Sequence, residues 1–462
     1  MSKRYLFYLI VPILSAAGIL LYFVAGEMLP HAPFVWSYRG PSPSDNKLNS
    51  GILRHYTKSS DVEQPSCNCS CVATDSITRA YSIGHRATTP SKTPLLDSSK
   101  RQNPVGHDVD IGTRLFDANS LGNNIVIQAA MRTGSSLVGE VFGQNDNIFY
   151  LFEPGISLEN EFALNGTVFV QQLYVDMLSS LYHCDITSQD FYLKWLSRKT
   201  QNHVRKVAPR LFDSLCPQMK PGGSGHSVCG AVLPRQFMQE CRAKRTIAIK
   251  SVRIWHIGMF LPLIQDINVK LKVIHLVRDP RGMTASRVPA MNVVKGTHHR
   301  LASNSFTEEM REYLRRFCSL SLENKETGWY HPKYRDNYLL LRYEDMALNP
   351  ERVTQLIYNF TGLGAVPECV SKWIAENTQT YKPGLYSTTR VSSKRYQAWR
   401  TTLDFKTAKA IENVGRCAEM MQHFGYLPLQ NESHLRKLSS SLVVPIPPPS
   451  GSQKYKSFRF AV

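Results

Sequence analysis

Two short basic segments that contain glycine each follow a run of apolar residues. The first, Arg132-Thr133-Gly134-Ser135-Ser136, comes one residue after the run 125–130. The second, Arg278-Asp279-Pro280-Arg281-Gly282, comes directly after the run 273–277, and Ser286 follows it. A turn from a parallel strand into a helix directs free backbone N–H groups at an anion. Two such turns, each with an arginine, predict a ligand that carries phosphate-like charge at two separated points.

Within these segments, each residue type has a distinct use. Gly134 lets the backbone approach a ligand closely, Ser135 and Ser136 add hydroxyls beside the first N–H groups of a helix, and Arg132 adds a permanent charge. Such a string also occurs as ordinary turn chemistry, so the second segment strengthens the interpretation. There, Asp279-Pro280 predicts a helix start, which leaves Arg278 available for an anion.

The elements that position these turns follow from the hydrophobic pattern after about residue 120. Short apolar runs, which predict buried strands, alternate with amphipathic segments, which predict helices. This alternation predicts an α/β fold, a P-loop-like three-layer structure with a parallel sheet and helices on both faces. We expect strands at 125–130, 148–152, 246–249, 271–277 and 338–342, helices near 136–144, 256–267, 281–288, 307–322, 350–361 and 405–424, and a loop at 209–230.

The N-terminal part of the chain predicts a membrane anchor. Lys3-Arg4 precede an uncharged, mostly apolar run, 5–25, which as a helix reaches about 31 Å at about 1.5 Å per residue. The basic residues favour a cytoplasmic tail, 1–4, and place the rest in the lumen of the secretory pathway. A cleaved signal peptide is the alternative.

Composition predicts the remaining domain boundaries. Residues 26–118 are polar and poor in apolar periodicity, which predicts a largely disordered stem, with a small irregular domain as the alternative. A catalytic domain follows at 119–438. The Ser- and Pro-rich segment 439–462 predicts a disordered tail.

Charge and cysteine content limit the partners. A net charge of +19 implies anionic partners, and a lumenal location makes nucleic acid an unsuitable one. Ten cysteines in a lumenal protein predict disulfides, whose connectivity spacing alone does not determine. Sequons for N-glycosylation agree with this location and stand at Asn68, Asn165, Asn359 and Asn431.

Six groups of residues, in this order, resemble the Golgi carbohydrate 6-O-sulfotransferases that act on galactose, N-acetylgalactosamine or N-acetylglucosamine. The resemblance covers about 122–435. The groups are Arg132–Ser136 with Val138-Gly139-Glu140, Asn147–Pro154, Ala248–Arg253, Leu276–Gly282 with Ala285-Ser286-Arg287, Leu341–Asp345, and Tyr386-Ser387-Thr388 with Trp399-Arg400. The C-terminal part is most similar to chondroitin 6-O-sulfotransferases, through Trp373-Ile374, Asn377-Thr378-Gln379 and Phe424-Gly425-Tyr426. The continuations Gly155-Ile156-Ser157 and Val391-Ser392 depart from the family pattern.

The resemblance implies a donor and an acceptor. The donor is adenosine 3′-phosphate 5′-phosphosulfate (PAPS), with its 5′-phosphosulfate at Arg132–Ser136, its 3′-phosphate at Arg278 and Ser286, and further contacts from Trp399 and Arg400. The acceptor is a glycosaminoglycan, with position 6 of N-acetylgalactosamine in chondroitin as the first choice. Galactose or N-acetylglucosamine in keratan-type chains is the alternative, and a non-catalytic glycan-binding protein is a remoter one. A nucleotide-dependent kinase is disfavoured, because the chain lacks its Gly-x-x-x-x-Gly-Lys-Ser/Thr string.

Sulfuryl transfer predicts three catalytic roles. Positioning and electrostatics dominate such reactions, and the sequence shows no metal constellation. Arg132 is the candidate for the charge on the leaving oxygen. Glu153, after the strand 148–152, is the candidate general base, with burial expected to raise its pKa; an ion pair or helix cap is the alternative. Lys250, after the strand 246–249, is the candidate for added charge near the sulfonate, or else a solvated strand end. We expect Arg342 to pair with Glu344 or Asp345.

Overall fold

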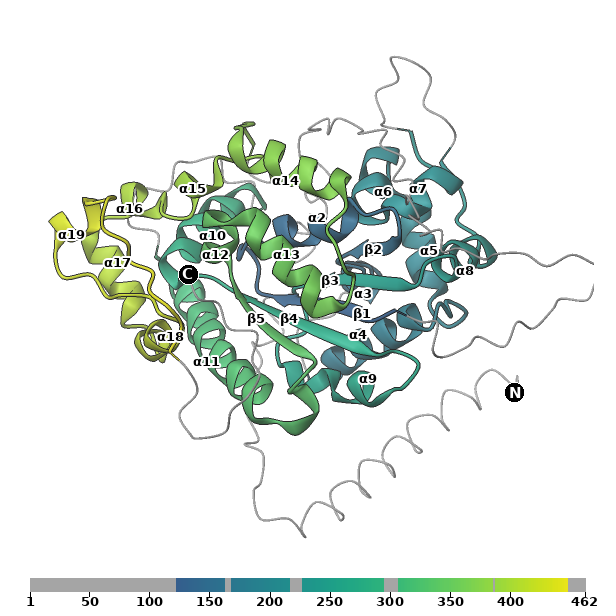
Figure 1. Cartoon of the computed structure of the whole chain (residues 1–462), viewed down its shortest axis with the longest axis horizontal. Coiled ribbons are helices and arrows are strands. Elements are labelled where there is room, and N and C mark those ends of the chain that lie inside the picture. Colours follow the sequence, from purple (N-terminus) through teal and green to yellow (C-terminus); the bar gives the residue numbers. More distant parts are fainter. Residues whose placement is uncertain (1–121, 163–167, 217–226, 295–305, 385–386, 448–462) are drawn as a thin grey trace, which may run out of the picture. The chain divides into compact units, whose positions relative to one another are not determined.

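A computed structural model describes residues 122–162, 168–216, 227–294, 306–384 and 387–447 (Figure 1). At its centre is a five-stranded sheet in which every paired neighbour is parallel, in the order β2-β3-β1-β4-β5. The strands are β1 Asn124–Ala129, β2 Ile148–Phe152, β3 Thr246–Ser251, β4 Leu271–Val277 and β5 Tyr338–Arg342. All five predicted strands are confirmed to within one or two residues. The predicted tail, anchor and stem at 1–4, 5–25 and 26–118 lie outside the described residues.

Helices connect the strands and continue after the last one. Between β1 and β3 lie α2 Ser135–Gly143, α3 Ile156–Phe162, α4 Val168–Tyr182, α5 Asp190–Ser197, α6 Gln201–Val207, α7 Pro209–Leu215 and α8 Pro234–Arg242. Between β3 and β5 lie η4 Ile257–Phe260, α9 Leu261–Gln265, α10 Pro280–Val294, α11 Glu308–Tyr330 and η5 Pro332–Tyr334. After β5 come α12 Tyr343–Leu348, α13 Pro350–Thr361, α14 Glu368–Gln379, α15 Ser392–Arg395, α16 Trp399–Thr402, α17 Phe405–Glu412, α18 Cys417–His423 and α19 Glu432–Arg436.

Successive strand residues bury their side chains on opposite faces of the sheet. Val126 and Leu151 belong to a core cluster with α4, α5, α7 and α8, whereas Ile127 and Tyr150 belong to another with α2, α13 and α14. This alternation follows from the two-residue period of a strand. Helices therefore cover both faces, and the predicted α/β class with a parallel sheet between two helical layers is confirmed.

Some predicted elements differ from the structure. The helix expected near 256–267 is a 3-10 turn followed by the short α9, because the His256 side chain accepts a hydrogen bond from the Gly258 N–H and begins a tight turn there. The helix expected at 405–424 is two helices, α17 and α18, separated by Gly415, which has φ of 50°. The segment 209–230 is not wholly a loop, since Pro209 begins α7.

The prediction of a disordered tail from Ser439 is wrong for residues 439–447. Leu442 is buried among Trp399, Leu429 and Leu435, and Val443 pairs with Tyr426. Tertiary contacts therefore fix this Ser- and Pro-rich segment. The packed domain extends beyond residue 438, while 448–462 lie outside the described residues.

Disulfides confirm the expectation from cysteine content. They join Cys184 to Cys241, Cys216 to Cys229 and Cys318 to Cys417. Of the helices in the described part of the chain, none combines the length and apolar composition needed to cross a membrane.

Candidate active site

The first basic segment forms a tight turn between β1 and α2. Arg132 and Gly134 both lie in the left-handed region, with φ of 70° and 89°. A Cβ atom on Gly134 would stand 2.2 Å from Cδ2 of Tyr343, so only glycine fits. Thr133 is buried and donates its hydroxyl to the Ala130 carbonyl, 2.7 Å away. A non-glycine residue such as Arg132 in this conformation is uncommon and is often found at functional sites.

The second segment lies beside the first. Nη1 of Arg278 donates to the Arg132 carbonyl oxygen over 3.0 Å, and Nε of Arg132 donates to Ser286 Oγ over 3.1 Å. The Arg278 guanidinium stands 4.3 Å from the centre of the Tyr343 ring, and its Nε is buried without a hydrogen-bond partner. A buried donor without an acceptor is what an anion site requires. The two predicted turns therefore form one cluster of cations and donors.

Glu153 follows β2 and lies between two cations. Its carboxylate accepts from Lys250 Nζ and, over 2.6 Å, from Nη1 of Arg253. Burial alone would raise the pKa of Glu153, but the charges of Lys250 and Arg253 outweigh burial and lower it to about 2. The expectation that burial raises this pKa is therefore wrong, and the ion-pair alternative describes the contacts. Glu153 has φ of 47°, so the backbone directly after β2 is strained, as is the turn after β1 at Arg132.

Lys250 lies within β3 and is buried. Burial lowers its pKa, although the Glu153 carboxylate acts in the opposite direction. It is therefore a paired interior cation and not a solvated strand end. The network continues from Arg253 to Glu159 at 3.0 Å. The departure from the family pattern at Gly155 fits this packing, because a Cβ there would stand 3.0 Å from the Tyr174 ring.

The strand order arranges these side chains in a row along the carboxyl edge of the sheet. Arg278 follows β4, Arg132 follows β1, Lys250 is in β3 and Glu153 follows β2, and these strands are successive neighbours in the sheet. Adjacent strands are about 4.8 Å apart. The donors for an anion therefore occupy the β4 and β1 end, and the only carboxylate among these four residues stands at the β2 end.

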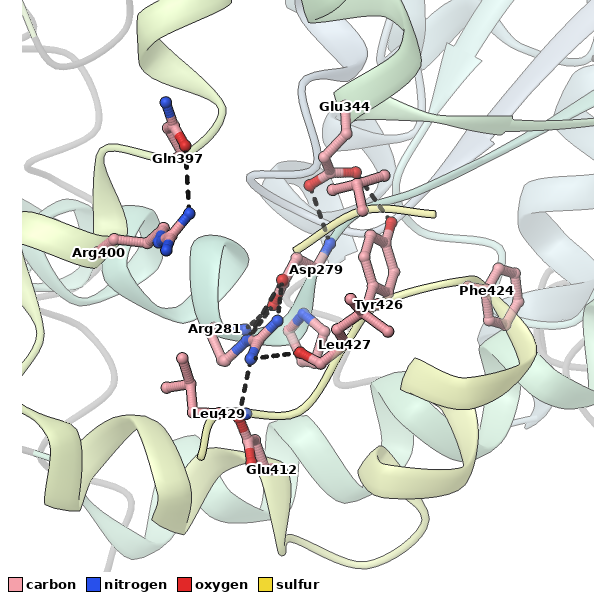
Figure 2. Close-up of polar contacts among 12 residues, drawn as sticks. Asp279, Arg281, Glu344, Gln397, Arg400, Glu412, Phe424, Tyr426, Leu427 and Leu429 are labelled. Atoms are coloured by element: carbon pink, nitrogen blue, oxygen red, sulfur yellow. Dashed lines mark hydrogen bonds and ion pairs between the residues drawn. The ribbon is translucent and has the colours of Figure 1, made fainter. Parts of the chain in front are cut away.

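A buried charge network supports the second turn (Figure 2). Arg281 donates to Asp279 over 2.6 Å and to Glu412 over 2.8 Å, and the Asp279 side chain also accepts from the Arg281 N–H at the start of α10. Glu344 accepts from the Asp279 N–H over 3.1 Å and from the Tyr426 hydroxyl over 2.9 Å. Burial and then the Asp279 charge raise the pKa of Glu344 to about 7. These contacts fix the backbone that follows Arg278.

Four other predicted site residues, Ser135, Ser136, Trp399 and Arg400, differ in their surroundings. Ser135 is buried and Ser136 is partly exposed in the first turn of α2. Trp399 is buried, with its ring 4.5 Å from the Arg281 guanidinium. Arg400 donates to backbone carbonyls of the C-terminal segment, at Leu435, His434, Lys437 and Ser440. Since these contacts occupy its guanidinium, the structure gives Arg400 a role in anchoring that segment and does not support donor binding.

Sequence reasoning missed Tyr343, Glu344 and Arg253 as site residues. Tyr343 contacts both turns, Glu344 holds the second, and Arg253 pairs with Glu153. Their position in the sequence could have identified them, since Tyr343 and Glu344 directly follow β5 and Arg253 closely follows β3. As expected for Arg342, its guanidinium pairs with Asp345, at 2.7 and 2.8 Å. In the described ranges no group of three or more His, Cys, Asp or Glu side chains is placed to hold a metal ion. His298-His299 lie outside those ranges.

A parallel sheet with two arginine-bearing turns and a paired carboxylate at its carboxyl edge is an α/β arrangement suited to the transfer of an anionic group. The chain belongs to the sulfotransferase domain family, whose model matches residues 123–425. It is 33% identical to carbohydrate sulfotransferase 3 of Tetronarce californica, over 69% of this chain and 76% of that protein. It is 32% identical to carbohydrate sulfotransferase 3 of Homo sapiens, over 69% and 70%, and 29% identical to carbohydrate sulfotransferase 1 of Danio rerio, over 73% and 88%. The predicted family is confirmed, and the chain is a carbohydrate sulfotransferase enzyme.

Proposed function

We propose that the chain transfers a sulfuryl group from PAPS to the 6-hydroxyl of N-acetylgalactosamine in chondroitin. The observation that carries this proposal is the row from Arg278 through Arg132 and Lys250 to Glu153 along one sheet edge. A donor with two anionic ends fits the first half of the row. A sugar hydroxyl that must lose a proton fits the carboxylate at the other end.

The residues present fit PAPS at the β4 and β1 end. Arg278, with its buried and unpartnered Nε, and Ser286 would hold the 3′-phosphate. Arg132 and the N–H groups of Gly134, Ser135 and Ser136 would hold the 5′-phosphosulfate, since the Thr133 N–H already donates to the Ala130 carbonyl. When bound, the donor supplies an electrophilic sulfuryl group for an oxygen nucleophile.

The chain's own residues then manage charge and the proton. Arg132 stabilises negative charge on the leaving oxygen, and Lys250 lies between that residue and the carboxylate in strand order. Glu153, with a pKa of about 2, is ionised throughout the neutral range and can accept the proton of the acceptor hydroxyl. The two cations lower the Glu153 pKa and so make it a weak base. An anion that binds near Lys250 would offset part of that positive charge and raise the Glu153 pKa.

The acceptor and the compartment belong to the same proposal. The C-terminal resemblance to chondroitin 6-O-sulfotransferases and the net charge of +19 favour a polyanionic chondroitin chain. Galactose or N-acetylglucosamine in keratan-type chains is the second candidate. The run 5–25 favours a type II single-pass protein of the Golgi membrane with a lumenal catalytic domain.

Product mapping tests this function. The full chain is incubated with labelled PAPS and with desulfated chondroitin or desulfated keratan, and the products are digested to disaccharides. The proposal predicts label on position 6 of N-acetylgalactosamine. Label only on galactose or N-acetylglucosamine would transfer the assignment to keratan-type acceptors, and no label on any sugar would overturn it. Arg132→Ala is the matched inactive control.

A further inference from the structure

The row of charges continues beyond β2, which is an edge strand of the sheet. Phe152, the last residue of β2, has a partly exposed side chain directly before Glu153. Lys250 Nζ stands 3.9 Å from the centre of the Phe152 ring, and Lys206 Nζ, from α6, stands 5.5 Å from it. Lys206 therefore lies next to the reaction edge, on the side away from Arg278.

Lys206 is exposed and forms no ion pair with any described carboxylate. Three other basic residues near α6 are paired with acidic ones: Lys194 with Asp190, Arg198 with Glu161 and Arg210 with Asp146. Two more, Lys199 and Arg205, stand over the rings of Trp195 and Phe212. The acid that shares a field with Lys206 is Glu140, which is buried, has a pKa raised by burial, and accepts a hydrogen bond from Gln144 over 2.7 Å.

The positive charge of Lys206 affects the pKa values of two neighbouring residues, His203 and Lys250. Burial, followed by the charges of Lys199 and Lys206, lowers the pKa of His203 to about 4. Burial also lowers the pKa of Lys250, and the Lys206 charge acts in the same direction. Cations that repel one another are stabilised most by an anion that binds close to all of them.

Resting on the proposed function, we propose that Lys206 binds the carboxylate of an acidic sugar next to the sugar that is sulfated. The reacting hydroxyl must lie near Glu153, since the donor occupies the Arg132 and Arg278 end of the row. The acceptor chain then continues over Phe152 toward α6, where its next charged group meets Lys206. Chondroitin carries one uronate carboxylate per disaccharide, whereas a desulfated keratan-type chain carries none. Lys206 thus makes the site selective for uronate-containing chains.

Paired acceptors test this proposal. Initial rates are measured for wild type, Lys206→Gln and Lys194→Gln with desulfated chondroitin and with the same polymer after its carboxylates are reduced to alcohols. Lys194 is a matched control, because it is exposed on the adjacent α5 but paired with Asp190 at 2.7 Å. For Lys206→Gln we expect KM for chondroitin to rise about fivefold, the size of one exposed charge pair, with kcat unchanged.

The reduced polymer separates a direct contact from a general effect. On this acceptor, wild type and Lys206→Gln should have equal KM values, and Lys194→Gln should match wild type on both. An equal rise in KM on both polymers, or no rise on chondroitin, would overturn the role of Lys206 while leaving the proposed function intact. If wild type sulfates neutral keratan-type chains and not chondroitin, the acceptor assignment and the role of Lys206 both fail.

Discussion

Nε of Arg132 donates a hydrogen bond to Ser286 Oγ over 3.1 Å and joins two segments that are 154 residues apart in sequence. Arg278 adds a second link through its hydrogen bond to the Arg132 carbonyl. The turn after β1 and the helix after β4 therefore hold each other in place. A ligand that binds one turn therefore also helps to position the other, which suits a donor with anionic groups at both ends.

Replacement of Arg132 should abolish most of the transfer. Arg132→Ala removes the charge assigned to the leaving oxygen, and we expect turnover to fall by about a hundred- to thousandfold. Arg132→Lys should recover only part of it, because the planar fork is lost. Initial rates with saturating PAPS measure the effect, and an unchanged melting temperature shows that the fold persists. Near-normal turnover of the alanine variant would remove Arg132 from the chemistry.

Gly134→Ala should damage the site through Tyr343. The new Cβ would stand 2.2 Å from the Tyr343 ring, so we expect PAPS affinity to fall by more than about tenfold as the turn moves. Gly364→Ala is a matched control, since Gly364 also has a positive φ, 78°, but no atom within 4 Å of the added Cβ. The control should cost about 1 kcal/mol of stability and leave PAPS affinity unchanged. Calorimetric titration of both variants with PAPS measures these affinities. If Gly134→Ala and Gly364→Ala bind PAPS equally well, the clash with Tyr343 does not affect the donor site.

Glu153→Gln should lower both the rate and the stability. Glutamine cannot take the acceptor's proton, so we expect a loss of about a hundredfold or more at saturating donor. It also leaves Lys250 buried without its carboxylate, while Arg253 keeps its ion pair with Glu159, at a cost of about 3 kcal/mol near neutral pH. Because the Glu153 pKa is lowered to about 2, its stabilising effect is complete above pH 4.5 and is lost as the pH falls toward 2.

The pH profile separates the base from the ion pair. A group with a pKa of about 2 produces no break in kcat/KM above pH 4, so wild type and Glu153→Gln should have profiles of the same shape at different heights. Retention of more than about a tenth of the wild-type rate would make Glu153 a positioning residue, since a general base contributes at least about a hundredfold.

Hydrophobic patterning was enough to place the strands but not the polar partners. The run 338–342 reads as a buried strand because four of its five residues are apolar, and it is β5. In contrast, nothing in the sequence shows that Lys250 and Arg253, 97 and 100 residues after Glu153, stand beside it. The direction of the Glu153 pKa shift depends on those two neighbours, so reasoning from burial alone gave the wrong sign.

Short helices were equally difficult to predict from the sequence. The helices α6 and α7 have seven residues each, too few to establish a helical period, and α7 lies in a segment with the loop-like composition of 209–230. Arg400 shows the limit of a motif match, because its backbone acceptors come from the segment around α19, which the pattern left out.

Glu344→Gln should change how stability depends on pH. The folded pKa of Glu344 is raised from 4.5 to about 7, so the native state binds more protons than the unfolded state between these values. Stability contributed by this group is therefore complete below pH 4.5 and is lost as the pH rises through 7, by on the order of 3 kcal/mol. Glutamine does not titrate, so the difference in unfolding free energy between variant and wild type should move in the variant's favour from pH 5 to 7.5. Histidines that titrate in both proteins cancel in this difference. A constant difference across this range would show that Glu344 is ionised in the native state.

The most direct test of the donor site compares PAPS with adenosine 5′-phosphosulfate, which lacks the 3′-phosphate. Calorimetric titration of wild type, Arg278→Ala and Arg132→Ala gives the affinity of each protein for both compounds. We predict that wild type prefers PAPS by about a hundredfold, the size of one charge-assisted, bidentate contact. Arg278→Ala should lose most of this preference, whereas Arg132→Ala should bind both compounds more weakly and keep the preference. If Arg278→Ala discriminates between the two compounds as strongly as wild type does, the 3′-phosphate lies elsewhere and the proposed arrangement along the sheet edge is wrong.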